Sequence, residues 1–167
     1  MEPESISEKR IQRALSVSRV NGWSVAGFAG LCTLAVLLMG DLVGFGIGLA
    51  VSAAGCMELR GHCLLKAGKR SAFSWLAGSQ LYLMGLLWGY AIYQLMRFDP
   101  DDVWSLFSPE FKDLILAINP DVYIVEALIR ITYPVTYYAL MLAVLFYQGG
   151  LCLYYLSRKK YLYPGQE

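Results

Sequence analysis

The sequence predicts an all-α integral membrane protein, built as a four-helix bundle with both termini in the cytoplasm and short amphipathic helices in its outer segment. Of the 167 residues, 57% are apolar and 16% are charged, whereas a soluble domain averages roughly 45–50% and 25%. Four apolar stretches each reach about 20 residues, the length that a spanning helix needs. Basic residues gather at the positions that four spans place on one side of the membrane.

The four apolar stretches qualify as spans because a helix satisfies its own backbone polar groups, which lipid cannot do. The expected spans are residues 22–39, 42–65, 72–96 and 134–156. They belong to one membrane domain, residues 22–157, which contains an outer segment at residues 97–133. Residues 1–21 form a basic N-terminal segment, and residues 158–167 form a cytoplasmic tail.

The distribution of charge sets the expected orientation. Most of the 14 basic residues lie before the first span, between the second and third, or after the fourth, and the outer segment carries more acidic than basic residues. By the positive-inside rule, the basic side is cytoplasmic. We therefore expect an integral protein of the plasma membrane, or of the inner membrane in a bacterium, with both termini in the cytoplasm.

The N-terminal segment has the pattern of a cationic amphipathic helix. Ile6, Arg10, Arg13 and Val17 recur at helical spacing, which favours a short helix lying on the inner leaflet. Ser5 with Glu8 makes a capping box for it. A frayed basic tail is the alternative interpretation.

Small residues predict close helix packing. Gly40, Gly44, Gly48, Ser52 and Cys56 recur at every fourth position, and such faces let helices approach closely in lipid. The Gly40–Asp41 connection makes the first two spans a tight antiparallel hairpin. The first span also carries small residues at four-residue spacing, at Gly22, Ala26 and Gly30. The third span repeats the pattern and is expected to make a second tight contact, through Gly85 and Gly89. Packing within the chain and packing between subunits both fit these stripes.

The outer segment contains three helix-start signals, each with a capping residue, a proline and an acid. They are Asp99-Pro100-Asp101, Ser108-Pro109-Glu110 and Asn119-Pro120-Asp121. We expect three short amphipathic helices. The third should run into the fourth span, where Pro134 should kink or break it because proline removes a backbone donor.

Polar residues at similar depth in three spans form the candidate site. Glu58 lies near the inner end of the second span, and Gln80 and Gln148 lie in the third and fourth. Glu58 and His62 share a helix face, so a protonated His62 would pair with the carboxylate, while Arg60 extends toward the headgroups. Glu58 is either an interfacial anchor or a proton- or ion-handling site. Tyr155 is assigned to an inner belt of aromatic anchors.

The remaining features argue against an enzyme. The sequence contains no nucleotide-binding, nucleophile-elbow or zinc-protease motif, and its single histidine excludes a bis-histidine haem. The acids Asp99, Asp101 and Asp102 are explained by the helix dipole without an ion. We expect no catalytic residues, metal, cofactor or nucleic-acid partner.

Two functions remain open. One is a homo-oligomeric ion or small-solute permeation protein, in which Glu58, Gln80 and Gln148 face a polar path. The other is a non-catalytic accessory or scaffold subunit of a membrane complex. The expected partners are the lipid bilayer and either further copies of the chain or another membrane subunit.

The topology can be tested with reporter fusions or with single cysteines labelled from one side of the membrane. Lys69 and the C-terminal tail should be accessible from the cytoplasm, and Asp113 from the opposite side, because the positive-inside rule places them there. Labelling of position 69 from outside would contradict the predicted orientation.

Overall fold

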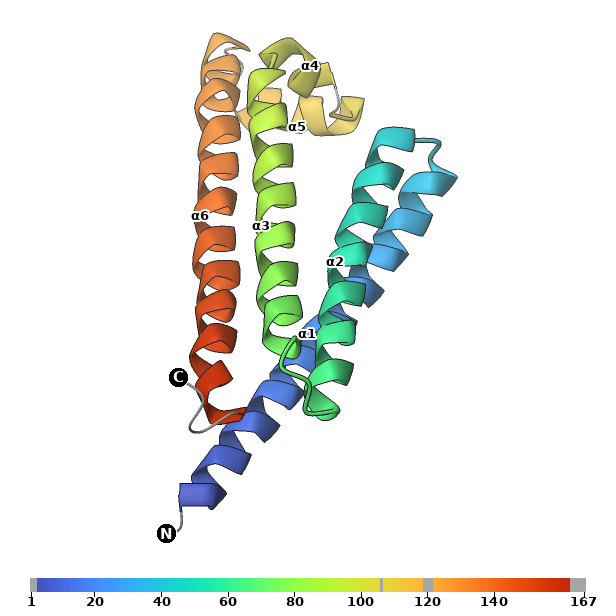
Figure 1. Ribbon diagram of the computed structural model, residues 1–167. Helices are drawn as coiled ribbons and strands as arrows, with labels where there is room; N and C mark the ends of the chain where they lie inside the picture. Colours follow the sequence, from blue (N-terminus) through green and yellow to red (C-terminus); the bar gives the residue numbers. More distant parts are fainter. Residues whose placement is uncertain (1–2, 106, 119–121, 163–167) are drawn as a thin grey trace. The chain divides into compact units, whose positions relative to one another are not determined.

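The computed structural model describes residues 3–105, 107–118 and 122–162. The helices, in chain order, are α1 (Pro3–Leu38), α2 (Leu42–Lys66), α3 (Ala72–Met96), α4 (Pro100–Ser105), α5 (Pro109–Ile118) and α6 (Val122–Leu162) (Figure 1). The all-helical prediction is confirmed. Within the described residues, three helices, α1, α2 and α6, are long and apolar enough to cross a membrane. The bounds of α3 coincide with those of the expected third span, but its passage through the membrane stays a prediction.

The chain divides into two compact units. The first comprises residues 1–86 and 145–167, and the second comprises residues 87–144. The first unit contains α1, α2, the first part of α3 and the last part of α6. The second contains the rest of α3 and α6, together with α4 and α5.

Helix α1 differs from the expectation of a separate helix on the membrane surface. Residues 3–20 are helical, but they are the first part of one uninterrupted helix that begins at Pro3, before the expected cap at Ser5. Ala14 and Ser18 are fully buried. The physical reason is therefore packing, because this part of α1 lies against other helices of the first unit.

The connection between α1 and α2 is a tight turn that ends one helix and starts the next. Gly40 takes the left-handed conformation, with φ of 77°, which costs glycine little because it has no Cβ. The N–H groups of Gly40 and Asp41 donate to carbonyls at the end of α1 over 3.0 and 3.2 Å, as in a Schellman motif. The Asp41 carboxylate then accepts from the N–H groups of Val43 and Gly44 at 3.0 Å and caps α2.

Close contacts between α1 and α2 follow from this turn. A Cβ atom added to Gly55 would lie 2.6 Å from the backbone nitrogen of Ala26, and one added to Gly48 would lie 3.2 Å from the Cα of Thr33. In each pair the two residues are almost equally far from the Gly40–Asp41 turn. The two helices therefore keep one antiparallel register along their length.

The stripe of small residues follows this contact only in part. Gly44 and Gly48 are both crowded by α1, whereas Cys56 is exposed and Gly55 makes the contact instead. An α-helix has 3.6 residues per turn, so a repeat of four drifts by about 40° at each step. The stripe therefore faces α1 at Gly44 and Gly48 and has rotated away from α1 at Cys56.

The glycines of α3 do not repeat this arrangement within the chain. A Cβ added to Gly85 or to Gly89 would meet nothing within 4 Å. A tight contact at these two positions stays a prediction.

In the second unit, two of the three expected helix starts are confirmed. Helices α4 and α5 begin at their prolines. The Asp99 carboxylate accepts from the N–H of Asp101 at 3.0 Å, and the Ser108 hydroxyl accepts from the N–H of Phe111 at 3.3 Å. The backbone N–H of Glu110, helped by the Ser108 hydroxyl, lowers the pKa of the Glu110 carboxyl. The third signal, at residues 119–121, lies outside the described residues.

Helix α6 is not broken at Pro134. The helix runs from Val122 to Leu162 with the proline inside it, so the predicted break is wrong, and the alternative, a kink, stays a prediction. The proline removes a single backbone bond, while the Thr136 hydroxyl donates to the Thr132 carbonyl at 2.8 Å and adds a bond to this turn. The neighbouring turns are enough to carry the helix past Pro134.

The helix contact predicts different responses to the same substitution at neighbouring glycines. Gly48→Leu should lower the free energy of unfolding by about 1–3 kcal/mol because the new side chain overpacks against Thr33. Gly46→Leu is the matched control, since an added Cβ there meets nothing within 4 Å. Thermal unfolding in mild detergent measures both. Equal stability of the two variants would contradict the close contact.

Candidate functional site: a buried carboxylate network

The first unit has an apolar core to which four helices contribute. Its fully buried members are Ala14, Leu65, Ala72, Phe73, Leu76 and Tyr155. They come from α1, α2, α3 and α6. Glu58 of α2 lies two turns before Leu65 and is on the same side of the helix, so its carboxylate is directed into the protein.

The Glu58 carboxylate is buried and bound by two neutral donors. The residue is 2% exposed. The Asn21 amide of α1 donates to Oε2 at 2.6 Å, and the Tyr155 hydroxyl of α6 donates to Oε1 at 2.6 Å. Both carboxylate oxygens are therefore satisfied, by side chains from two other helices. Such bonds offset the cost of burying a polar group.

A second tyrosine extends this network to the protein surface. The Tyr147 hydroxyl donates to Oδ1 of Asn21 at 3.0 Å, and Tyr147 is 57% exposed while Asn21 is 8% exposed. Asn21 and Tyr147 also line a hollow of about 370 Å³, with Ser16, Val17, Val20 and Ser24. Tyr147 and Asn21 thus connect an open hollow to the buried carboxylate.

Gln80 joins the network, and Gln148 lies apart from it. The Gln80 side chain is 1% exposed; it interacts with the Glu58 carboxylate and donates to the Ser79 hydroxyl at 3.2 Å. Gln148 is also buried, two turns before Tyr155 on the same side of α6. Among the described residues, no hydrogen bond joins Gln148 to Glu58, and the Oε1 atoms of both glutamines have no partner. Of the three residues expected to converge, the structure brings together two.

The expected pairing of Glu58 with His62 is wrong. Nδ1 of His62 lies 3.1 Å from the Ser18 hydroxyl, which also donates to the Leu15 carbonyl at 3.0 Å. The pairing fails because Asn21 and Tyr155 already occupy both carboxylate oxygens, and α1 places Ser18 beside the imidazole.

Arg60 lies outside the network. It is exposed, and its guanidinium stacks over the ring of Trp75 at 4.4 Å from the centroid. This cation–π contact holds the side chain at the protein surface. Arg60 makes no contact with Glu58 among the described interactions, and its role as a surface anchor stays a prediction.

Sequence reasoning missed the network's hydrogen-bond donors. Tyr155 was assigned to a belt of aromatic anchors, yet it is fully buried, and Asn21 was assigned to the end of the N-terminal segment. An approximate signal was present for Asn21, because a two-residue turn pairs residues at equal distances from it, and Glu58 is only two residues nearer to the turn than Asn21 is. No comparable local signal identifies Tyr155, which is distant in the chain.

The arrangement can accept a proton without losing a hydrogen bond. With Glu58 ionised, the Asn21 amide donates to the carboxylate and its carbonyl accepts from Tyr147. After protonation, the Asn21 side-chain amide can rotate by about 180°, so that its carbonyl accepts from the carboxyl O–H. The amide N–H then donates to the Tyr147 oxygen. The Glu58 carboxyl and the Asn21 amide thus keep hydrogen-bond partners in both states.

The chain matches no protein-family model, no curated protein and no solved structure. In the part of the chain that the structure describes, no group of three or more His, Cys, Asp or Glu side chains could hold a metal ion. The inference of function therefore depends on the Glu58 network and its surroundings.

The two tyrosines should differ in their effect on stability. Tyr155→Phe leaves Oε1 of Glu58 buried without a donor and should lower the free energy of unfolding by about 1–3 kcal/mol. Tyr147→Phe also removes one hydroxyl, but from the exposed end of the network, and should cost less. Thermal unfolding of both variants in the same detergent tests this difference. A larger loss for Tyr147→Phe would contradict the assigned roles.

Proposed function

We propose that the chain is a four-span membrane protein that binds and releases a proton at Glu58, within a homo-oligomeric ion or small-solute permeation protein. In this proposal both termini are cytoplasmic and the network lies in the cytoplasmic half of the bilayer. Helix α3 is the fourth span: its 25 residues extend about 37 Å, more than the roughly 30 Å of the hydrocarbon core. The observation that carries the proposal is the buried carboxylate with neutral donors.

A purely structural role does not require a titratable group at this position. Ionisable residues within spans are costly and commonly mark sites of ion or proton movement. Glutamine would occupy nearly the same volume and would offer an oxygen to Tyr155 without the cost of burying a charge. The presence of a glutamate therefore favours a function that uses its proton.

The connection to the surface supports exchange of that proton. The Tyr147 hydroxyl and the Asn21 amide lie between Glu58 and an open hollow. An amide does not release its own protons readily, so we propose that the Asn21 side chain moves and lets water from the hollow deliver the proton to the Glu58 carboxylate or take it away. The partly exposed Tyr147 side chain has room to move with it.

The second candidate is an accessory or scaffold subunit. Its support is that a Cβ added to Gly85 or to Gly89 would meet no described residue within 4 Å, which leaves room for another helix to approach closely. In this case the Glu58 network serves only to hold α1, α2 and α6 together. The two candidates differ in whether the charge of Glu58 matters.

Proton flux into proteoliposomes tests the proposal, with a pH-sensitive dye inside the vesicles and a membrane potential as the driving force. Glu58→Gln should abolish the flux while leaving the expression level and oligomeric state unchanged, because glutamine preserves size and hydrogen bonding but cannot be ionised. The matched control is Glu126→Gln, which neutralises an exposed glutamate paired with Arg130 at 2.7 Å. Its flux should equal that of the unmodified protein.

Infrared difference spectra between low and high pH give a second measurement that does not depend on transport. A carboxyl band present in the unmodified protein should vanish in Glu58→Gln and persist in Glu126→Gln. Unchanged flux in Glu58→Gln, or the absence of any Glu58-dependent band, would contradict proton binding and favour the accessory subunit.

A further inference from the structure

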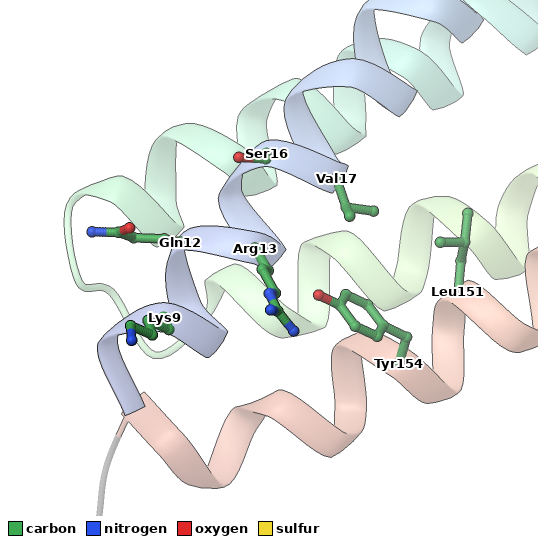
Figure 2. A pocket seen from close by; sticks show the side chains of 7 residues that line it. All are labelled: Lys9, Gln12, Arg13, Ser16, Val17, Leu151 and Tyr154. Carbon is green, nitrogen blue, oxygen red and sulfur yellow. The ribbon is translucent and has the colours of Figure 1, made fainter. Parts of the chain in front are cut away.

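A second hollow of the first unit lies between the beginning of α1 and the end of α6. It has a volume of about 520 Å³ and is lined by Lys9, Gln12, Arg13, Ser16, Val17, Leu151 and Tyr154. Figure 2 shows the Arg13 side chain and the Tyr154 ring directed toward one another from the two helices. The hollow thus has walls from parts of the chain that are far apart in sequence.

One wall of this hollow carries positive charge. Lys9 and Arg13 lie one helical turn apart on α1, and both are exposed. Neither forms an ion pair with any described residue. On the other side, the guanidinium of Arg158 stacks on the Tyr154 ring at 5.0 Å from the centroid. Arginine and lysine together present several N–H donors, the chemistry that recognises a phosphate group.

The rest of the hollow is apolar and continues along α1. Val17 and Leu151 supply hydrocarbon beyond the charged end. Ser16 and Val17 also line the neighbouring hollow that reaches Val20 and Tyr147. The two hollows therefore adjoin and form one groove between α1 and α6, charged at one end and mainly apolar along its length.

We infer that this groove binds an anionic phospholipid, with its phosphate held by Lys9 and Arg13 and one acyl chain lying along Val17 and Leu151. The position along the helix supports this occupant, because Lys9 and Arg13 lie at the start of the segment of α1 that could cross a membrane, Glu8–Leu38. Basic pockets between spans at this depth bind anionic headgroups. A free phosphate would use the charged end alone and leave the apolar part of the groove unoccupied.

Native mass spectrometry of the full chain, released from phosphatidylcholine vesicles with or without phosphatidylglycerol, tests the inference. The protein should retain phosphatidylglycerol in preference to phosphatidylcholine. The double variant Lys9→Gln, Arg13→Gln should lose this preference by a factor on the order of tenfold. Lys66→Gln with Lys69→Gln is the control, because it removes the same charge from exposed positions outside the groove.

Gln12→Glu provides an independent variant at an exposed position of the groove, where folding should be unaffected. It should weaken phosphatidylglycerol retention because it adds a like charge beside the phosphate. Circular dichroism and gel filtration verify that each variant is folded.

Three results would overturn the inference. The first is equal retention of phosphatidylglycerol by the Lys9/Arg13 variant and the unmodified protein. The second is an equal loss in the Lys66/Lys69 control, which would indicate a general effect of charge. The third is displacement of phosphatidylglycerol by inorganic phosphate or glycerol phosphate at equal concentration, which would assign the charged end to a free phosphate.

Discussion

The two-residue turn at Gly40 and Asp41 is the constraint on which the arrangement of α1 and α2 depends. A connection this short prevents one helix from sliding along the other, so residues of α1 lie near residues of α2 that are about equally far from the turn. The same register brings Thr33 to Gly48 and Ala26 to Gly55. Farther along, it leaves Asn21 within hydrogen-bond distance of Glu58, which is two residues nearer to the turn than Asn21 is. A longer loop would allow the helices to slide past one another. The candidate site therefore depends on a turn that lies more than four helical turns away from it.

The Glu58 network shows how a carboxylate is kept inside an apolar core without a cation. Burial withdraws the group from water, and the resulting cost is offset by hydrogen bonds to both oxygens. Asn21 and Tyr155 supply these bonds at 2.6 Å each. Since the donors come from α1 and α6, the carboxylate also ties together helices that are distant in the chain.

The network and the groove lie on the same part of the first unit. Asn21 and Tyr147 belong to both, since they connect to Glu58 and also line the hollow between α1 and α6. The basic residues Lys9 and Arg13 are at the other end of that groove. The long faces of α1 and α6 thus carry charge at one end, hydrocarbon in the middle and a polar connection to the buried carboxylate. The groove between α1 and α6 therefore forms the proposed lipid site and also connects to the proposed proton site at Glu58.

The sequence by itself determined the helices and several of their ends, because these depend on neighbouring residues. Apolar length defined α2 and α3, proline after a capping side chain started α4 and α5, and Gly40–Asp41 ended α1. Glu58 and Gln80 were recognised as candidate site residues because polar side chains within a membrane span are energetically costly and therefore rare. Only the tertiary structure decided which side chains bind Glu58, since Tyr155 is 97 residues away in the chain. Local patterns specify a helix and its faces, whereas hydrogen-bond partners depend on how those faces pack.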